Sequence, residues 1–304
     1  MEILNTTFMN TDERDYSINR FSLILEGINR EQTMTFNYGF TASNGKSFLM
    51  ERICNLLGDY ADAFNVNLLT NKMSGAGDAN STLINFKNKR FMYCSEPEAN
   101  AKLNTNFVKM LTGDIIKARG LYSQNEESIK PSYNIFICCN ALPEFDTYDE
   151  GIVRRVRLLE YSTKFTETPK KPFEKLIKIY TIEELSLIEC GLLKIFIDNY
   201  NKLKLLNYKY IEPDKLSVLR NLYINTNKDD IRNLLMEHFE EGSKTDFIKL
   251  KDIRALLRSN GIHKDTVSIR YIIQDIYQNC MFIESKRIDN ILIKSLFLFI
   301  KPKI

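Results

Sequence analysis

Residues 33–61 read TMTFNYGFTASNGKSFLMERICNLLGDYA, and the order of patterns in this stretch decides the fold. Residues 33–39 alternate in the manner of a strand. From 47 to 61 apolar residues recur at helical spacing, and Gly58 stands near their end, which predicts a helix. Because a strand, a glycine-bearing loop and a helix in this order form a phosphate-binding unit, the stretch predicts an α/β fold with a parallel sheet at its centre.

The loop between that strand and helix carries the groups that a triphosphate needs. Backbone N–H groups turned inward, an ammonium and a magnesium-binding hydroxyl are supplied by Gly45, Lys46 and Ser47. The usual pattern places another glycine six residues before the lysine, where this chain has Phe40; its glycine comes one position earlier. A turn that contains these residues by chance is the alternative. The predicted ATP-binding residues are Gly39, Ser43, Asn44, Gly45, Lys46 and Ser47.

An acidic pair follows the next predicted strand, residues 89–95, which runs into the sequence SEPE at 95–98. Acidic groups at the carboxyl end of a buried strand lie beside the phosphate loop of an α/β sheet. One carboxylate can hold magnesium while the other activates water, as phosphoryl transfer requires. We assign Glu96, with Ser47, to magnesium and Glu98 to the water, although the sequence leaves the two roles interchangeable. A solvated turn is the alternative.

Residues 132–139 are apolar after their first positions, which predicts a strand buried on both faces, and Asn140 follows it directly. A side-chain amide there can sense a γ-phosphate. Fourteen residues later come Arg154 and Arg155, a pair suited to reach the nucleotide of a neighbouring subunit. A basic surface run is the alternative. The predicted catalytic residues are Lys46, Glu96, Glu98, Asn140, Arg154 and Arg155.

Composition indicates an ordinary globular protein: of 304 residues, 44% are hydrophobic and 27% charged, which favours about two domains. A net charge of +3 does not identify a nucleic-acid partner. Six cysteines without a CxxC pair and two distant histidines argue against a disulfide scaffold, a zinc ribbon or a Ser-His-Asp hydrolase. No signal-like opening or membrane-length apolar run is present in the sequence, so we expect a cytoplasmic protein.

The remaining patterns divide the chain. We expect helices over 12–29, with Asp12 as N-cap, over 100–112 and over 174–207, and a loop over 62–80. Residues 115–122 and 132–139 flank a polar tip and predict a β-hairpin or a strand pair. Three helices and a two-stranded ribbon after residue 228 have the order of a winged helix. The predicted domains are an N-terminal helical segment (1–35), an ATPase core (36–165), a helical linker (166–210) and a winged-helix-like α+β domain (211–304).

Residues 36–165, roughly two-fifths of the chain, resemble the ATPase core of superfamily 3 helicases. The resemblance is to the subgroup found in primase-helicases of poxviruses, other large DNA viruses, phages and plasmids. Six ordered segments carry it: SNGKS, LGDYA followed by LLT, SEPE, then KLN with VKMLTGD and KARGLY, then IFICCNALPEFD, and finally DEGIVRRV.

The resemblance implies an AAA+-type ATPase that forms a ring, usually a hexamer, with ATP at subunit junctions and single-stranded DNA in the channel. It also implies a DNA-contacting hairpin, whose matching positions are Lys109, Thr112, Gly113, Asp114, Lys117 and Arg119, with Lys130 on the return arm. Among these, Lys117, Arg119 and Lys130 are the predicted DNA-binding residues; ordinary solvated lysines are the alternative. The TGD step is one residue shorter than the usual TGGD of the family.

Two readings of function remain beside a third, an ATPase that moves protein or packages DNA, against which only the resemblance argues. The leading one is an ATP- and Mg²⁺-dependent DNA helicase for replication of a viral or plasmid-like genome. Only about 35 residues precede the phosphate loop here, so we expect no priming activity and a separate primase or replication partner. The alternative is a non-catalytic factor that binds DNA or a helicase through an ATPase fold. Retention of the lysine, both acidic residues, the asparagine and the arginines favours the helicase.

Overall fold

The computed structural model describes residues 1–39, 41–70, 81–95, 102–113, 115–119, 125–243, 245–260, 266–277, 279–288 and 291–303. The chain divides into two compact units. The first contains residues 1–145 and 150–220, and the second contains residues 146–149 and 221–304. Across the described residues, no helix combines the length and apolar character needed to cross a membrane.

The first unit is an α/β fold with a five-stranded parallel sheet, as predicted. The strands lie in the order β2 (Ala61–Ala63), β3 (Phe91–Ser95), β6 (Asn134–Cys139), β1 (Met34–Tyr38), β7 (Val156–Glu160). All six residues of β6 are buried, in keeping with its apolar sequence after Asn134. Because the strands are parallel, the segments that follow β1, β3 and β6 all leave from the same edge of the sheet.

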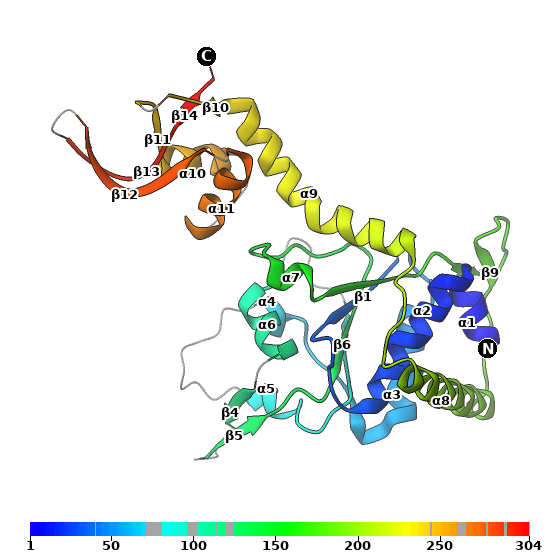
Figure 1. The fold of residues 1–304 in the computed structure, drawn as a ribbon. Coiled ribbons are helices and arrows are strands. Elements are labelled where there is room, and N and C mark those ends of the chain that lie inside the picture. The colour runs from blue at the N-terminus through cyan, green and yellow to red at the C-terminus, as the bar shows by residue number, and fades with distance from the viewer. Residues whose placement is uncertain are drawn as a thin grey trace. The chain divides into compact units, whose positions relative to one another are not determined.

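Helices cover both faces of this sheet (Figure 1). One face carries α1 (Glu2–Thr7), α2 (Thr11–Ser22), α3 (Lys46–Leu57) and α8 (Ile182–Leu205); the other carries α4 (Asn67–Thr70), α6 (Thr105–Gly113) and α7 (Glu150–Val153). Phe21 of α2 stacks on Phe136 of β6, with ring centroids 5.2 Å apart. The unit also contains η1 (Leu23–Glu26), η2 (Gly58–Tyr60), α5 (Ser81–Ile84), β4 (Ile116–Arg119), β5 (Glu126–Ile129), β8 (Lys164–Thr166) and β9 (Glu174–Leu176).

The segment predicted as a linker, 166–210, lies within the first unit. Its helix begins at Ile182 rather than near residue 174. Thr181 is the N-cap of this helix and forms a capping box with Glu184. Leu192 and Phe196 of α8 are buried in the same apolar cluster as α2 and α3. The helix therefore forms part of the layer that covers the sheet.

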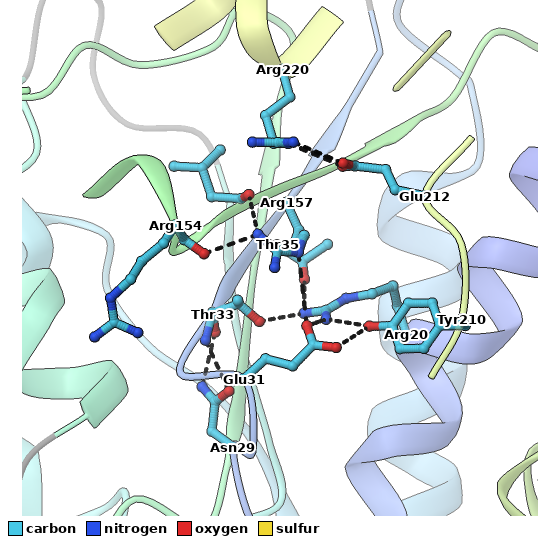
Figure 2. A network of polar contacts seen from close by, with 11 residues as sticks. Arg20, Asn29, Glu31, Thr33, Thr35, Arg154, Arg157, Tyr210, Glu212 and Arg220 are labelled. Carbon is cyan, nitrogen blue, oxygen red and sulfur yellow. Dashed lines mark hydrogen bonds and ion pairs between the residues drawn. The ribbon is translucent and has the colours of Figure 1, made fainter. Parts of the chain in front are cut away.

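A buried polar network fastens the end of this segment to the sheet (Figure 2). The Arg20 guanidinium, 1% exposed, donates to Glu31 at 2.6 Å and to the Tyr210 hydroxyl at 2.9 Å. It also donates to the hydroxyls of Thr33 and Thr35 at 2.8 and 2.9 Å. Tyr210 in turn donates to Glu31 at 2.6 Å. Residue 210 is thus tied to α2 and to the segment that leads into β1.

Some local predictions are wrong. Residues 132–139 do not form a hairpin arm: β4 pairs antiparallel with β5, inside the expected polar tip, and β6 lies in the main sheet. The reason is burial, because β6 has strands on both sides, whereas Glu126 stands exposed at an outer strand. The N-cap of α2 is Asn10, whose side chain accepts from the backbone of Asp12 and Glu13. The expected loop 62–80 includes most of β2 and all of α4, and residues 71–80 lie outside the described residues.

The second unit is built from helices and two small antiparallel sheets. Its elements are most of α9 (Asp214–His238), then β10 (Phe239–Glu241), β11 (Phe247–Lys249), α10 (Leu250–Ser259), α11 (Thr266–Ile276), β12 (Met281–Ile288), β13 (Ile291–Leu298) and β14 (Ile300–Pro302). Strand β13 lies between β11 and β12, and β10 pairs with β14. Ile253 of α10, Ile273 of α11 and Phe297 of β13 are each fully buried in its core.

Candidate nucleotide-binding site

The loop after β1 requires glycine at position 39. A Cβ atom placed on Gly39 would lie 2.2 Å from Asn44 Nδ2 and 2.9 Å from the carbonyl oxygen of Tyr161. The second atom belongs to the backbone that follows β7, so it cannot turn away as a side chain can. Glycine is therefore needed at position 39, one residue earlier than in the usual pattern, because Asn44 of the same loop packs closely against it. Phe40, which replaces the usual glycine, lies outside the described residues.

The next part of the loop reverses direction through two left-handed residues. Ser43 has φ +57° and Gly45 has φ +85°, and Gly45 is the N-cap of α3. Glycine adopts this conformation without the strain that a Cβ atom would cause. A Cβ at position 45 would also approach Phe165 to 3.1 Å. The turn places Lys46 at the first position of the twelve-residue helix α3.

The Lys46 ammonium joins the loop to the neighbouring strand. Its Nζ donates to Asn140 Oδ1 at 2.9 Å, to Asn44 Oδ1 at 3.1 Å and to the Gly39 carbonyl oxygen at 3.3 Å. The lysine is only 5% exposed. A buried cation at the N-terminus of a helix creates a positive potential that favours an anion. The structure thus brings together four of the predicted site residues in an arrangement suited to phosphate.

The magnesium assignment is only partly described. Ser47 is exposed in the first turn of α3. Glu96 and Glu98 lie outside the described residues, although β3 ends at Ser95, opposite Cys138 of β6. Among the residues that the structure does describe, no three His, Cys, Asp or Glu side chains are grouped as a metal site. The metal and water roles of the two glutamates therefore stay predictions.

The two predicted catalytic arginines have different surroundings. Arg155 is 7% exposed, and its guanidinium donates to Thr112 Oγ1 at 3.0 Å and to the Gly151 carbonyl oxygen at 2.7 Å. Arg154 is exposed and donates to Gln32 Oε1 at 2.9 Å. Figure 2 shows its side chain directed away from the Arg20 network. Of the two, Arg154 has the side chain that can meet another molecule.

Both arginines precede β7, whereas Lys46 follows β1, so they stand at opposite edges of the sheet. A five-residue strand spans about 16 Å at about 3.3 Å per residue. Arg154 therefore does not belong to the phosphate loop of its own chain. The hydrogen-bond partner of Arg154, Gln32, precedes β1 and was not among the predicted residues. It has φ +54°, and a single glutamine carries no motif that would mark it in the sequence.

The predicted DNA-binding residues lie on or beside the β4–β5 hairpin. Lys117 is exposed on β4, opposite Ser128, and Lys130 is exposed just after β5. Arg119 is half-buried opposite Glu126. Asp114 and the residues between the two strands, 120–124, lie outside the described residues.

A cavity of about 460 Å³ adjoins the phosphate loop. It is lined by residues 43–48, by α1 and by residues 165–180, which sequence reasoning did not bring together. Apolar walls include Ile3, Phe165 and Ile177, and the rings of Phe48 and Tyr180 lie 5.7 Å apart. Such a mostly apolar hollow beside the predicted phosphate-binding loop suits a flat nucleobase.

In comparisons with known proteins, the chain is similar to helicases and primases of viruses. A model of a family of unknown function (DUF5906) matches residues 38–155. A protein of Acanthamoeba polyphaga mimivirus named "Putative helicase" is 34% identical over 213 residues, 65% of this chain and 22% of that protein. A primase of fowlpox virus is 31% identical over 146 residues, 46% of this chain and 18% of that protein. These relatives confirm the predicted resemblance to helicases and primases of large DNA viruses.

The fold also has a solved counterpart. An apo structure of the NrS-1 C-terminal region is similar over 98% of this chain and 74% of that chain, with a TM-score of 0.54 and 14% identity. At that identity the similarity concerns the fold. The chain spans about a fifth of the length of the two viral relatives described above.

Proposed function

We propose that this chain is an ATP-hydrolysing motor that moves along single-stranded DNA, acting as a helicase in replication of a viral or plasmid-like genome. The observation that carries the proposal is the 2.9 Å hydrogen bond from Lys46 Nζ to Asn140 Oδ1. It joins the loop after β1 to the end of the adjacent strand β6. A γ-phosphate held by Lys46 would therefore lie within reach of the Asn140 amide.

The residues divide the work of phosphoryl transfer. The helix N-terminus at Gly45–Ser47 and the Lys46 ammonium would hold the phosphates, and the cavity beside the loop would hold the base. Mg²⁺ bound by Ser47 and Glu96 would neutralise phosphate charge. Glu98 would accept a proton from the attacking water, and Asn140 would orient that water or the γ-phosphate.

The position of Arg154 supports a ring. The Arg154 guanidinium and Lys46 stand at opposite edges of one sheet. Arg154 can therefore complete the phosphate site of a neighbouring copy but not that of its own chain. Positive charge supplied in this way stabilises the transition state. We therefore assign this role to Arg154 and a structural role to the buried Arg155. A closed ring, a hexamer by the resemblance, would supply one such junction for each copy.

The hairpin and the second unit complete the proposal. Lys117, Arg119 and Lys130 would face single-stranded DNA in the channel and follow its phosphates without reading bases. The order β11, α10, α11, β12, β13, with β13 in the middle of the sheet, supports a winged-helix-like second unit. A primase or another replication protein is the proposed partner.

ATP hydrolysis with and without single-stranded DNA tests the proposal, on the wild type, Lys46→Ala and Lys194→Ala. Lys194 is an exposed lysine of α8 and serves as the matched control. We expect DNA to stimulate turnover in the wild type and the control, and Lys46→Ala to abolish it. Turnover that survives in Lys46→Ala would show that the site lies elsewhere. Binding of DNA without turnover in any protein would support the non-catalytic factor instead.

A further inference from the structure

Helix α10 of the second unit has one apolar and one basic face. Leu250, Ile253 and Leu257 are buried in the core of the unit. Lys251, Arg254 and Arg258 are spaced at i, i+3 and i+7, and at 100° per residue they lie within about 60° of one another around the helix axis. Lys251 and Arg258 are exposed and Arg254 is half-exposed. The helix thus presents a row of three cations away from its core.

The basic row borders a hollow of about 430 Å³. Its other wall is β13, which contributes the exposed Lys294 together with Ser295. Among the described residues that line the hollow, four are basic and none is acidic. Asp252 is exposed on the same helix, but it stands about 100° around the axis from Lys251. The hollow therefore concentrates positive charge in a chain whose net charge is only +3.

Helix α11, the third helix of the winged-helix order, offers much less charge. Its sequence TVSIRYIIQDI contains one basic residue, Arg270, and one acidic residue, Asp275. The Arg270 guanidinium lies 4.2 Å from the ring centroid of Phe282, on β12 of the same unit. A guanidinium that makes a cation–π contact with a ring of its own unit is less available to bind a phosphate. Helix α10, with three basic residues, therefore carries more positive charge than α11.

We propose that the hollow between α10 and β13 binds the phosphate backbone of nucleic acid. Seven residues of helix between Lys251 and Arg258 span about 10 Å, and over that length one DNA strand carries about three phosphates. Three cations in a row match this spacing, and Lys294 stands beside them. Because the groups are flexible and cationic, the contact reads charge and not sequence. The site stands on residues of the second unit and does not depend on ATP hydrolysis.

The test is binding of fluorescent DNA to the full chain without nucleotide, followed by anisotropy over a series of salt concentrations. A 20-base-pair duplex and a 20-nucleotide single strand are the two probes. In the variant Lys251→Ala/Arg258→Ala, loss of two phosphate contacts should reduce the salt slope by about 1.8 on the duplex or about 1.4 on the single strand. Through counterion release alone, duplex affinity at 0.15 M salt should fall about 30-fold.

Lys194→Ala/Lys202→Ala is the matched control, because it removes the same charge from exposed positions of α8 in the first unit. It should bind both probes like the wild type. Lys46→Ala should also keep full affinity, which separates this site from the proposed ATPase. A fall in affinity for either probe, confined to the α10 variant, supports the site. Equal affinity and equal salt slopes in the α10 variant and the control, on both probes, would overturn it.

Discussion

The shape of the phosphate loop can be tested with one methyl group, by Gly39→Ala. The added Cβ would force Asn44 to move, which breaks its 2.5 Å bond to the Thr41 carbonyl and its 3.1 Å bond from Lys46. These bonds are worth about 1 and at least about 1.5 kcal/mol. The fixed backbone oxygen of Tyr161, 2.9 Å away, adds an overpacking cost of at least about 1 kcal/mol. We therefore expect the free energy of unfolding to fall by about 3 kcal/mol or more, with loss of ATP binding.

Gly191→Ala provides the control for this substitution. Gly191 lies inside α8, it is exposed, and a Cβ there would meet nothing within 4 Å. Alanine is favoured over glycine in a helix interior by about 0.8–1 kcal/mol, so the same change should here stabilise the fold. Urea unfolding and nucleotide titration of both variants give the measurement. If Gly39→Ala were as stable as the wild type and bound ATP normally, the close packing described for this loop would be refuted.

The remaining predictions concern the arginines and acid stability. Arg154→Ala should lower DNA-stimulated turnover by about 10³-fold with ATP affinity nearly unchanged, measured by steady-state hydrolysis and nucleotide titration. Arg155→Ala should instead destabilise the fold by about 2 kcal/mol in urea unfolding, because it removes buried hydrogen bonds; equal effects of the two would contradict their separation. Burial alone would raise the pKa of Glu31. The positive charges of Arg20 and Arg157 and the hydrogen bond from Tyr210 instead hold that pKa below its ordinary value of 4.5. Its stabilising contribution should therefore be present above pH 4.5 and lost as the pH falls further, through the folded-state pKa. Stability of Glu31→Gln should vary less with pH in that acidic range, and an unchanged pH profile would exclude this role.

Much of the first unit could be predicted from local pattern. The strand at 33–39, the helix after Lys46 and the buried strand before Asn140 have periodicities that tertiary packing only reinforces. A hairpin beginning near residue 115 was predicted, but its return strand was not. The pairing of β4 with β5 depends on 132–139 being buried as β6 in the main sheet. Strand β2 has three residues, too few for any alternation to be visible.

The candidate site divides in the same way. Lys46 and Asn140 carry motif signals, and the structure places them in contact. Gln32 and the walls of the cavity carry none, because their roles arise from segments far apart in sequence, such as Ile3 and Tyr180. From the sequence, Arg154 and Arg155 were predicted to act as one pair. Their different roles follow only from the structure, in which Arg155 is buried and Arg154 is exposed.

The contact of Tyr210 with Arg20 and Glu31 bears on where this polypeptide can be shortened. The match to the family model ends at residue 155, so an experimenter guided by it alone would cut there. Such a fragment would lose α8, expose Phe21 to water and leave the Arg20 guanidinium without one of its acceptors. The boundary of the family-model match and the boundary of the folded unit are therefore different. The shortest self-sufficient piece of the first unit should extend past residue 210, to about residue 220.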